Sequence, residues 1–175
     1  NRHYNYCLEQ RVCDLEALLN RLEIKSNVTL VMHDWGGPIG MTYAVRNPSK
    51  IARLVVLNTT GFLVPPGKKL HWTLRVCRSS RLVNFLIQRF NLFSIAMTYL
   101  GCRMRPMSSE VRQAYTGPYD SWKNRVAIIR FIQDIPLGPE DDSYHTLHKT
   151  QKKLEQFQGL PVIICWGEKD FIFDR

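Results

Sequence analysis

The sequence lacks the features that mark several specialised classes of protein. Its five cysteines are scattered, with no CxxC pair and no zinc-binding spacing, which favours a reduced cytoplasmic setting over a disulfide framework. It contains no internal repeat, no low-complexity segment and no uninterrupted apolar run of about 20 residues that would span a membrane. It opens without an initiator methionine or a signal-peptide core, so we expect an interior piece of a longer chain.

Acidic residues are scarce in the middle of the chain. The formal net charge is +9, and between Phe62 and Gln133 only Glu110 and Asp120 oppose the basic residues. Those basic residues are Lys68, Lys69, Arg75, Arg78, Arg81, Arg89, Arg103, Arg105, Arg112, Lys123, Arg125 and Arg130. The excess indicates a solvated basic face or a contact surface for an acidic protein or an anionic membrane. No nucleic-acid-binding motif accompanies it, so nucleic acid is not expected as a partner.

One stretch combines a strand pattern with an abrupt turn. Val28–Met32 is a run of apolar β-formers typical of a strand buried on both faces. Gly36 and Gly37 remove side chains that would clash in a sharp strand-to-helix turn, and Pro38 suits the first turn of a helix. Asp34 lies at the apex, which is the arrangement of a nucleophile elbow with a carboxylate in place of serine.

The remaining pattern predicts a parallel α/β domain interrupted by helices. Helices are expected over 8–22, from the elbow to about Arg46, and over 143–158; strands are expected over 54–58 and 160–166. Between them, helices are expected near 69–78, over 81–100, and from an N-capping Asp120 through a face containing Trp122 and Ile129. We therefore predict an α/β core over 1–61, a helical block over 62–142 and a return to the core over 143–175.

A carboxylate at the elbow suits a different reaction from a serine. It needs no deprotonation near neutral pH and can displace a leaving group from sp³ carbon, forming an alkyl ester on Asp34. A histidine-activated water would then hydrolyse the ester, with a second acid orienting the histidine. Asp170, which follows the strand 160–166, is the candidate acid, and Glu168 and Asp174 are lower-ranked neighbours. The competing position at the end of the strand 54–58 is occupied by Asn58, which cannot be an anion.

The histidine of this scheme has no candidate in the sequence. In the chain order usual for this fold, the histidine comes after the acid. All five histidines instead precede Asp170: His3, His33, His71, His145 and His148. We therefore expect the base to lie outside these residues and the chain alone to be inactive. Trp35 follows Asp34 directly, and its indole N–H is suited to hold a departing halide or a developing oxyanion; a core aromatic is the alternative.

These motifs resemble a known family. His33–Gly37 is similar to the elbow of α/β-hydrolases with an aspartate nucleophile, chiefly haloalkane dehalogenases and epoxide hydrolases. Leu57–Thr59, Pro118–Trp122, Arg130–Pro136 and Cys165–Asp170 resemble the dehalogenase side. They look most like its third subfamily, which includes the β-lactone decarboxylases of bacterial long-chain olefin synthesis.

The resemblance implies an α/β-hydrolase fold with a helical cap over 62–142, and it implies neither a metal nor another cofactor. It assigns Asp34 as nucleophile, Trp35 as leaving-group stabiliser and Asp170 as acid, whereas Met32 departs from the smaller residue usual before an elbow. We expect first a dehalogenase-like hydrolysis of a carbon–halogen bond. A β-lactone decarboxylase that yields long-chain cis-alkenes, an epoxide hydrolase and a non-catalytic binding module are the alternatives. The expected partners are a small hydrophobic substrate and, through the basic cap, partner enzymes or a membrane surface.

Overall fold

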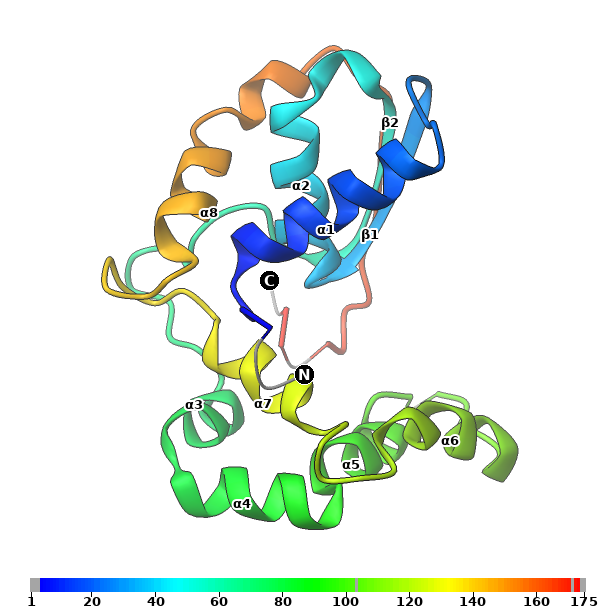
Figure 1. Cartoon of the computed structure of the whole chain (residues 1–175), viewed down its shortest axis with the longest axis vertical. Helices are drawn as coiled ribbons and strands as arrows, with labels where there is room; N and C mark the ends of the chain where they lie inside the picture. The colour runs from blue at the N-terminus through cyan, green and yellow to red at the C-terminus, as the bar shows by residue number, and fades with distance from the viewer. Residues whose placement is uncertain (1–3, 103, 171, 174–175) are drawn as a thin grey trace. The chain divides into compact units, whose positions relative to one another are not determined.

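The chain consists of two compact units (Figure 1). The computed structural model describes residues 4–102, 104–170 and 172–173. A helical unit contains residues 4–6 and Trp72–Gln133, and a sheet unit contains Cys7–His71 and the described part of 134–175. The segment Trp72–Gln133 falls inside the range 62–142 that the sequence assigns to a cap; the cap itself stays a prediction.

The sheet unit is built on three parallel strands, which confirms the predicted parallel α/β class. β1 (Val28–Asp34) pairs with β2 (Ile51–Thr59), and β2 pairs with β3 (Val162–Cys165), so β2 is central. α2 (Gly36–Arg46) carries the chain from β1 to β2 and ends before a short 3₁₀ turn, η1 (Pro48–Lys50), because the proline disfavours continued helix.

Three helices of the sheet unit build its core with one face of the sheet. α1 (Leu8–Arg21), α2 and α8 (Tyr144–Gln151) pack on one another, and Figure 1 shows them grouped beside β1 and β2. The buried cluster consists of Leu8, Val12, Met32, Tyr43, Ala44, Ile51, Leu54, Leu147 and Phe157. The four-residue spacing of Leu8 and Val12 places both side chains on the same face of α1, whereas Leu18 further along the helix and Leu22 at its C-cap are exposed.

Strand residues that point away from this core are exposed. Met32 and Leu54 are buried, whereas Val31 is 66% exposed because successive side chains of a strand point to opposite faces. In β3 both faces are exposed, since the adjacent Ile163 and Ile164 are 60% and 67% exposed. The prediction that Val28–Met32 is buried on both faces is therefore wrong for the part of the chain that the structure describes.

Short helices joined by turns form the helical unit. They are α3 (Trp72–Ser79), α4 (Arg81–Phe90), α5 (Leu92–Leu100), α6 (Ser109–Thr116), η2 (Gly117–Tyr119) and α7 (Val126–Gln133). Asn91 adopts a left-handed conformation (φ 55°) and separates α4 from α5, which confirms a helix pair over the apolar stretch 81–100. Among the described residues, no helix has the length and apolar character needed to cross a membrane.

Two predicted helix boundaries are wrong. α7 begins at Val126, and the Asp120 carboxylate instead accepts a hydrogen bond from the Asn124 side chain (2.8 Å) inside the preceding turn. Asp120 therefore does not cap α7, and Trp122 precedes it. The helix expected over 143–158 is divided, because the backbone leaves the helical conformation after α8 and forms a separate 3₁₀ turn, η3 (Leu154–Phe157).

Some of the basic residues of the helical unit bind its own backbone. Arg125 donates hydrogen bonds to the carbonyl oxygens of Tyr119 (2.7 Å) and Gln88 (2.8 Å), and Arg78 donates one to that of Gln133 (2.5 Å). Such cations satisfy carbonyl groups that helix ends leave without an intrahelical partner. Part of the basic excess is therefore structural.

Candidate active site

The strand-to-helix turn after β1 holds Asp34 in a left-handed backbone conformation. Its φ is 50°, and α2 begins two residues later, at Gly36, with Trp35 as the N-cap residue. A positive φ is costly for a residue with a Cβ atom and is common at functional turns, although Asp tolerates it better than most residues. The sharp elbow that the sequence predicts is present.

The backbone of the elbow packs closely on the end of β2. The Thr59 hydroxyl donates a hydrogen bond to the Asp34 carbonyl oxygen. A Cβ atom on Gly37 would overlap the Thr59 side chain and the Thr60 carbonyl oxygen, so glycine is required there by the close approach of two backbones. Sequence reasoning had not included Thr59 in the site, because nothing in the local pattern shows its pairing with Asp34.

Met32 is accommodated by a second glycine. It is 2% exposed, and a Cβ atom on Gly40 would lie 2.6 Å from the Met32 sulfur. The absence of a side chain on the first turns of α2 therefore makes room for the larger residue at the end of β1. This contact explains how the elbow tolerates its departure from the family pattern.

The surroundings of Asp34 raise the pKa of its carboxyl above the usual value. Loss of hydration is the main cause, while the nearby His33 and the Trp35 backbone N–H, which favour the anion, act in the opposite direction. The negative charge of Asp170 adds a smaller upward contribution to the Asp34 pKa. The two carboxylates that the sequence singles out thus lie within electrostatic range of each other.

Asp170 is held by the loop that follows β3. Its Oδ1 accepts hydrogen bonds from the backbone N–H groups of Ile172 (2.8 Å) and Phe173 (3.0 Å), and its own N–H donates to the Gly167 carbonyl oxygen (3.2 Å). Trp166 closes the same loop, because its indole N–H donates to the Phe173 carbonyl oxygen (2.9 Å). The carboxylate therefore has a defined place relative to β3.

Asn58 connects this loop to β2. Its side-chain NH₂ donates to the Gly167 carbonyl oxygen (3.1 Å), and its Oδ1 accepts from the Gly167 N–H (2.7 Å). In the sequence, Asn58 occupies the competing position for the acid, but its amide cannot ionise. Its structural role is to bind the loop that contains Asp170.

Trp35 lies under a buried cation. The guanidinium carbon of Arg11 is 4.4 Å from the centroid of the indole ring, and its Nη1 lies 3.0 Å from Asp134 Oδ2. The Ser143 hydroxyl donates to Asp134 Oδ1 (2.6 Å) and accepts from the Leu8 N–H (2.7 Å). Sequence reasoning missed Arg11, Asp134 and Ser143, which come together only through the fold.

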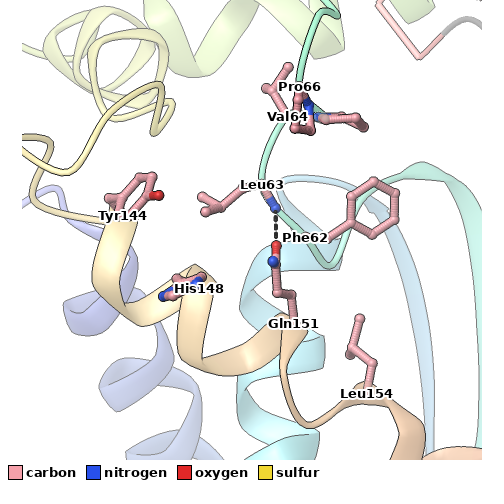
Figure 2. A pocket seen from close by; sticks show the side chains of 9 residues that line it. Phe62, Leu63, Val64, Pro66, Tyr144, His148, Gln151 and Leu154 are labelled. Atoms are coloured by element: carbon pink, nitrogen blue, oxygen red, sulfur yellow. Dashed lines mark hydrogen bonds between the residues drawn. The ribbon is translucent and has the colours of Figure 1, made fainter.

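A separate open groove of about 560 Å³ lies between the segment after β2 and helix α8 (Figure 2). Figure 2 shows the Leu63 N–H donating to Gln151 Oε1 (2.9 Å) at its centre, with Tyr144 and His148 on one side. The rings of Tyr144 and His148 are stacked, with centroids 5.8 Å apart. Asp34, Trp35 and Asp170 are not among the residues that line this groove.

Among the described residues, no three His, Cys, Asp or Glu side chains are grouped so as to hold a metal ion. His33 is exposed next to Asp34, and His3 and Asp174 lie outside the described residues.

The fold and the comparison with known sequences agree on the class of protein. A sequence model of the α/β-hydrolase fold matches residues 2–175, so the chain belongs to the α/β-hydrolase fold family. It is 48% identical over 172 residues to a cis-3-alkyl-4-alkyloxetan-2-one decarboxylase of Shewanella oneidensis, covering 98% of this chain and 54% of that protein. It is 26% identical over 145 residues to a haloalkane dehalogenase of Mycolicibacterium paratuberculosis, covering 83% of this chain and 45% of that protein.

Similarity to solved structures supports the same fold. The crystal structure of a haloalkane dehalogenase from Bradyrhizobium elkani superimposes with a TM-score of 0.77 at 19% identity, covering 94% of this chain and 67% of that one. The chain spans about half the length of each of the two curated relatives named above. The resemblance to haloalkane dehalogenases and β-lactone decarboxylases that the motifs indicate is therefore confirmed.

Proposed function

We propose that the protein removes CO₂ from a cis-3,4-dialkyl oxetan-2-one, a four-membered β-lactone, and releases a cis-alkene. The observation that carries the proposal is the 48% identity to a decarboxylase of this type, against 26% to a haloalkane dehalogenase. Dehalogenation, which the sequence alone placed first, becomes the second candidate, supported by the shared fold and by the Asp34–Trp35 pair.

Asp34 is proposed as the nucleophile of a two-step reaction. Its carboxylate attacks ring carbon C4, the C4–O bond breaks, and the ring oxygen leaves as part of a free carboxylate on C3. The bond between C3 and that carboxylate then breaks, its electron pair forms the C3=C4 double bond, and the C4–O bond to Asp34 breaks. CO₂ departs and the Asp34 carboxylate is regenerated, so no water is consumed.

The stereochemistry of this route agrees with a cis product. Displacement at C4 inverts that carbon and places the new ester bond opposite the C3 carboxylate. Loss of CO₂ and of Asp34 from opposite sides then leaves the two alkyl groups on the same side of the double bond. A cis-lactone therefore gives a cis-alkene.

Trp35 and Asp170 are proposed to assist the reaction of Asp34 with its substrate. The Trp35 indole N–H would hold the carboxylate that forms when the ring opens, or a halide in the second candidate reaction. Asp170, fixed through Oδ1 by two backbone N–H groups, would orient a histidine base through its other oxygen where hydrolysis of the ester is required.

The basic and apolar surface of the helical unit is proposed to contact an anionic membrane. Along α5, the buried residues are polar (Ser94 and Thr98), whereas Leu92, Ile95 and Tyr99 are exposed, the reverse of the usual arrangement. Exposed apolar side chains among arginines suit the interface of an anionic bilayer. Sedimentation with phosphatidylglycerol vesicles should fall as salt rises, and no sedimentation at low salt would contradict the proposal.

The reaction is tested by offering three substrates in parallel to the full-length protein that contains these residues. A cis-3,4-dialkyl oxetan-2-one should give cis-alkene and CO₂ in equal amounts, with no β-hydroxy acid. A 1-bromoalkane and a terminal epoxide of matched length should give little bromide or diol. Bromide release without alkene would make the protein a dehalogenase, and no product from any substrate would favour a binding module.

A further inference from the structure

We propose that Arg11 is a positioning residue that holds the Trp35 indole in place beside Asp34 and strengthens its N–H as a donor. The effect of Arg11 on anion binding by Trp35 rests on the proposed function, whereas its effect on the position of the Trp35 ring does not. Arg11 is not part of the elbow motif, because it lies on α1, which precedes β1.

The contact between the two side chains is a cation–π stack inside the protein. The Arg11 guanidinium carbon lies 4.4 Å from the ring centroid of Trp35, and Arg11 as a whole is only 6% exposed. A planar guanidinium stacks on an aromatic face while its edge makes hydrogen bonds, which the ammonium of lysine cannot reproduce. The stack occupies the ring face and so restricts rotation of the indole.

Arg11 is itself fixed from the other side. Its Nη1 lies 3.0 Å from Asp134 Oδ2, and the side chains of this pair are 5% and 7% exposed. Ser143, which is fully buried, donates to Asp134 Oδ1 (2.6 Å) and accepts from the N–H of Leu8 at the start of α1 (2.7 Å). This series of contacts connects the beginning of α1 to the indole next to the nucleophile.

Stability alone does not require this arrangement. A buried ion pair can often be replaced by apolar residues of similar volume without loss of stability. Such a replacement would fill the same space but would leave the indole without a stacked cation. The positive charge over the ring also draws electron density from the indole, which makes the Nε1–H a better donor to an anion.

The test compares four variants of the protein. Arg11→Met with Asp134→Leu removes the guanidinium and leaves no buried charge unpaired, and Arg11→Lys keeps a cation beside Asp134 but loses the planar stack. Arg46→Met is the matched control, since Arg46 forms an exposed ion pair with Glu9 (2.5 Å) in the same unit. Trp35→Phe assigns the signals of Trp35.

The first readout is fluorine-19 NMR of protein labelled with fluorotryptophan. The Trp35 resonance should move toward the free indole position, or broaden, in the double variant and to a lesser degree in Arg11→Lys. The Trp166 resonance serves as an internal control because that indole N–H donates to Phe173 (2.9 Å), and it should stay in place. An unchanged Trp35 resonance in both variants would overturn the positioning role.

The second readout is quenching of Trp35 fluorescence by bromide, with bromide used as the probe anion. We expect the apparent dissociation constant to rise at least about fivefold in the double variant and less than about twofold in Arg46→Met. Equal affinity in a folded double variant would overturn the donor-strengthening part of the proposal. If the parent shows no quenching assignable to Trp35, the leaving-anion role in the proposed function fails, and the NMR result still decides the placement of the ring.

Discussion

Asn58 and Gly167 bind each other through two hydrogen bonds, one in each direction, with donor–acceptor distances of 3.1 and 2.7 Å. The pair joins the end of the central strand β2 to the loop that follows β3 and contains Asp170. Asn58 is 9% exposed, and both the nitrogen and the oxygen of its side-chain amide are used in this contact. The placement of Asp170 thus depends on β2 as well as on its own strand.

Replacing Asn58 should therefore destabilise the protein and displace the Asp170 loop. Asn58→Ala removes both hydrogen bonds and should lower the free energy of unfolding by about 2 kcal/mol, measured by urea denaturation. Asn58→Asp keeps the acceptor for the Gly167 N–H but turns a carboxylate oxygen toward the Gly167 carbonyl oxygen, so it should cost at least as much near neutral pH. Equal stability of Asn58→Ala and the parent would show that the pair contributes nothing.

Gly37 and Gly36 form a matched pair for testing the close approach at the elbow. A Cβ atom on Gly37 meets Thr59 and Thr60, whereas one on Gly36 meets nothing within 4 Å. Gly37→Ala should therefore lower the free energy of unfolding by at least about 2 kcal/mol, and Gly36→Ala should change it by less than about 1 kcal/mol. Thermal unfolding of the two variants side by side measures the contrast, and similar behaviour would contradict the packing.

The elements that the sequence predicts are those set by short-range patterns. The apolar run of β1 and the glycines after Asp34 act within a few residues, and the structure has a strand and a sharp turn there. The helix start predicted at Asp120 is wrong because an aspartate caps a turn as well as a helix. The predicted burial of β1 on both faces is wrong because a continuous apolar run does not reveal which elements cover each face.

The supporting contacts of the candidate site could not be predicted from such patterns. Asn58 and Gly167 are 109 residues apart, and Ser143 and Leu8 are 135 apart. Nothing in a single sequence records that two distant polar residues meet. These contacts follow from the parallel order of the strands and the packing of α1, so they become visible only with the fold.

Ser143 should contribute strongly to the stability of the sheet unit. Cys7, the N-cap residue of α1, makes no side-chain capping bond, and the Ser143 hydroxyl accepts the Leu8 N–H in its place. Ser143→Ala should cost about 2 kcal/mol by urea denaturation, since it also removes the bond to Asp134. The exposed Ser49→Ala is the control, expected to change stability by less than about 0.5 kcal/mol.

The raised pKa of Asp34 predicts that its ionisation opposes folding. Between the unfolded value of 3.8 and the higher folded value, the folded state binds more protons, so this contribution to stability is lost as pH rises. Asp34→Asn, which tolerates the positive φ, should therefore melt at a higher temperature than the parent near about pH 7. The difference should shrink as pH falls toward 3.8, and a variant that melts lower at neutral pH would contradict the assignment.

The central claim is that Asp34 forms a covalent ester with the substrate. A single turnover with a cis-3,4-dialkyl oxetan-2-one, quenched in acid and analysed by peptide mass spectrometry, tests it most directly. The account predicts a transient adduct on Asp34 with the full mass of the lactone, and cis-alkene formation reduced by more than about a thousandfold in Asp34→Asn. Alkene formation by Asp34→Asn at the parent rate, or an adduct on another residue, would contradict it.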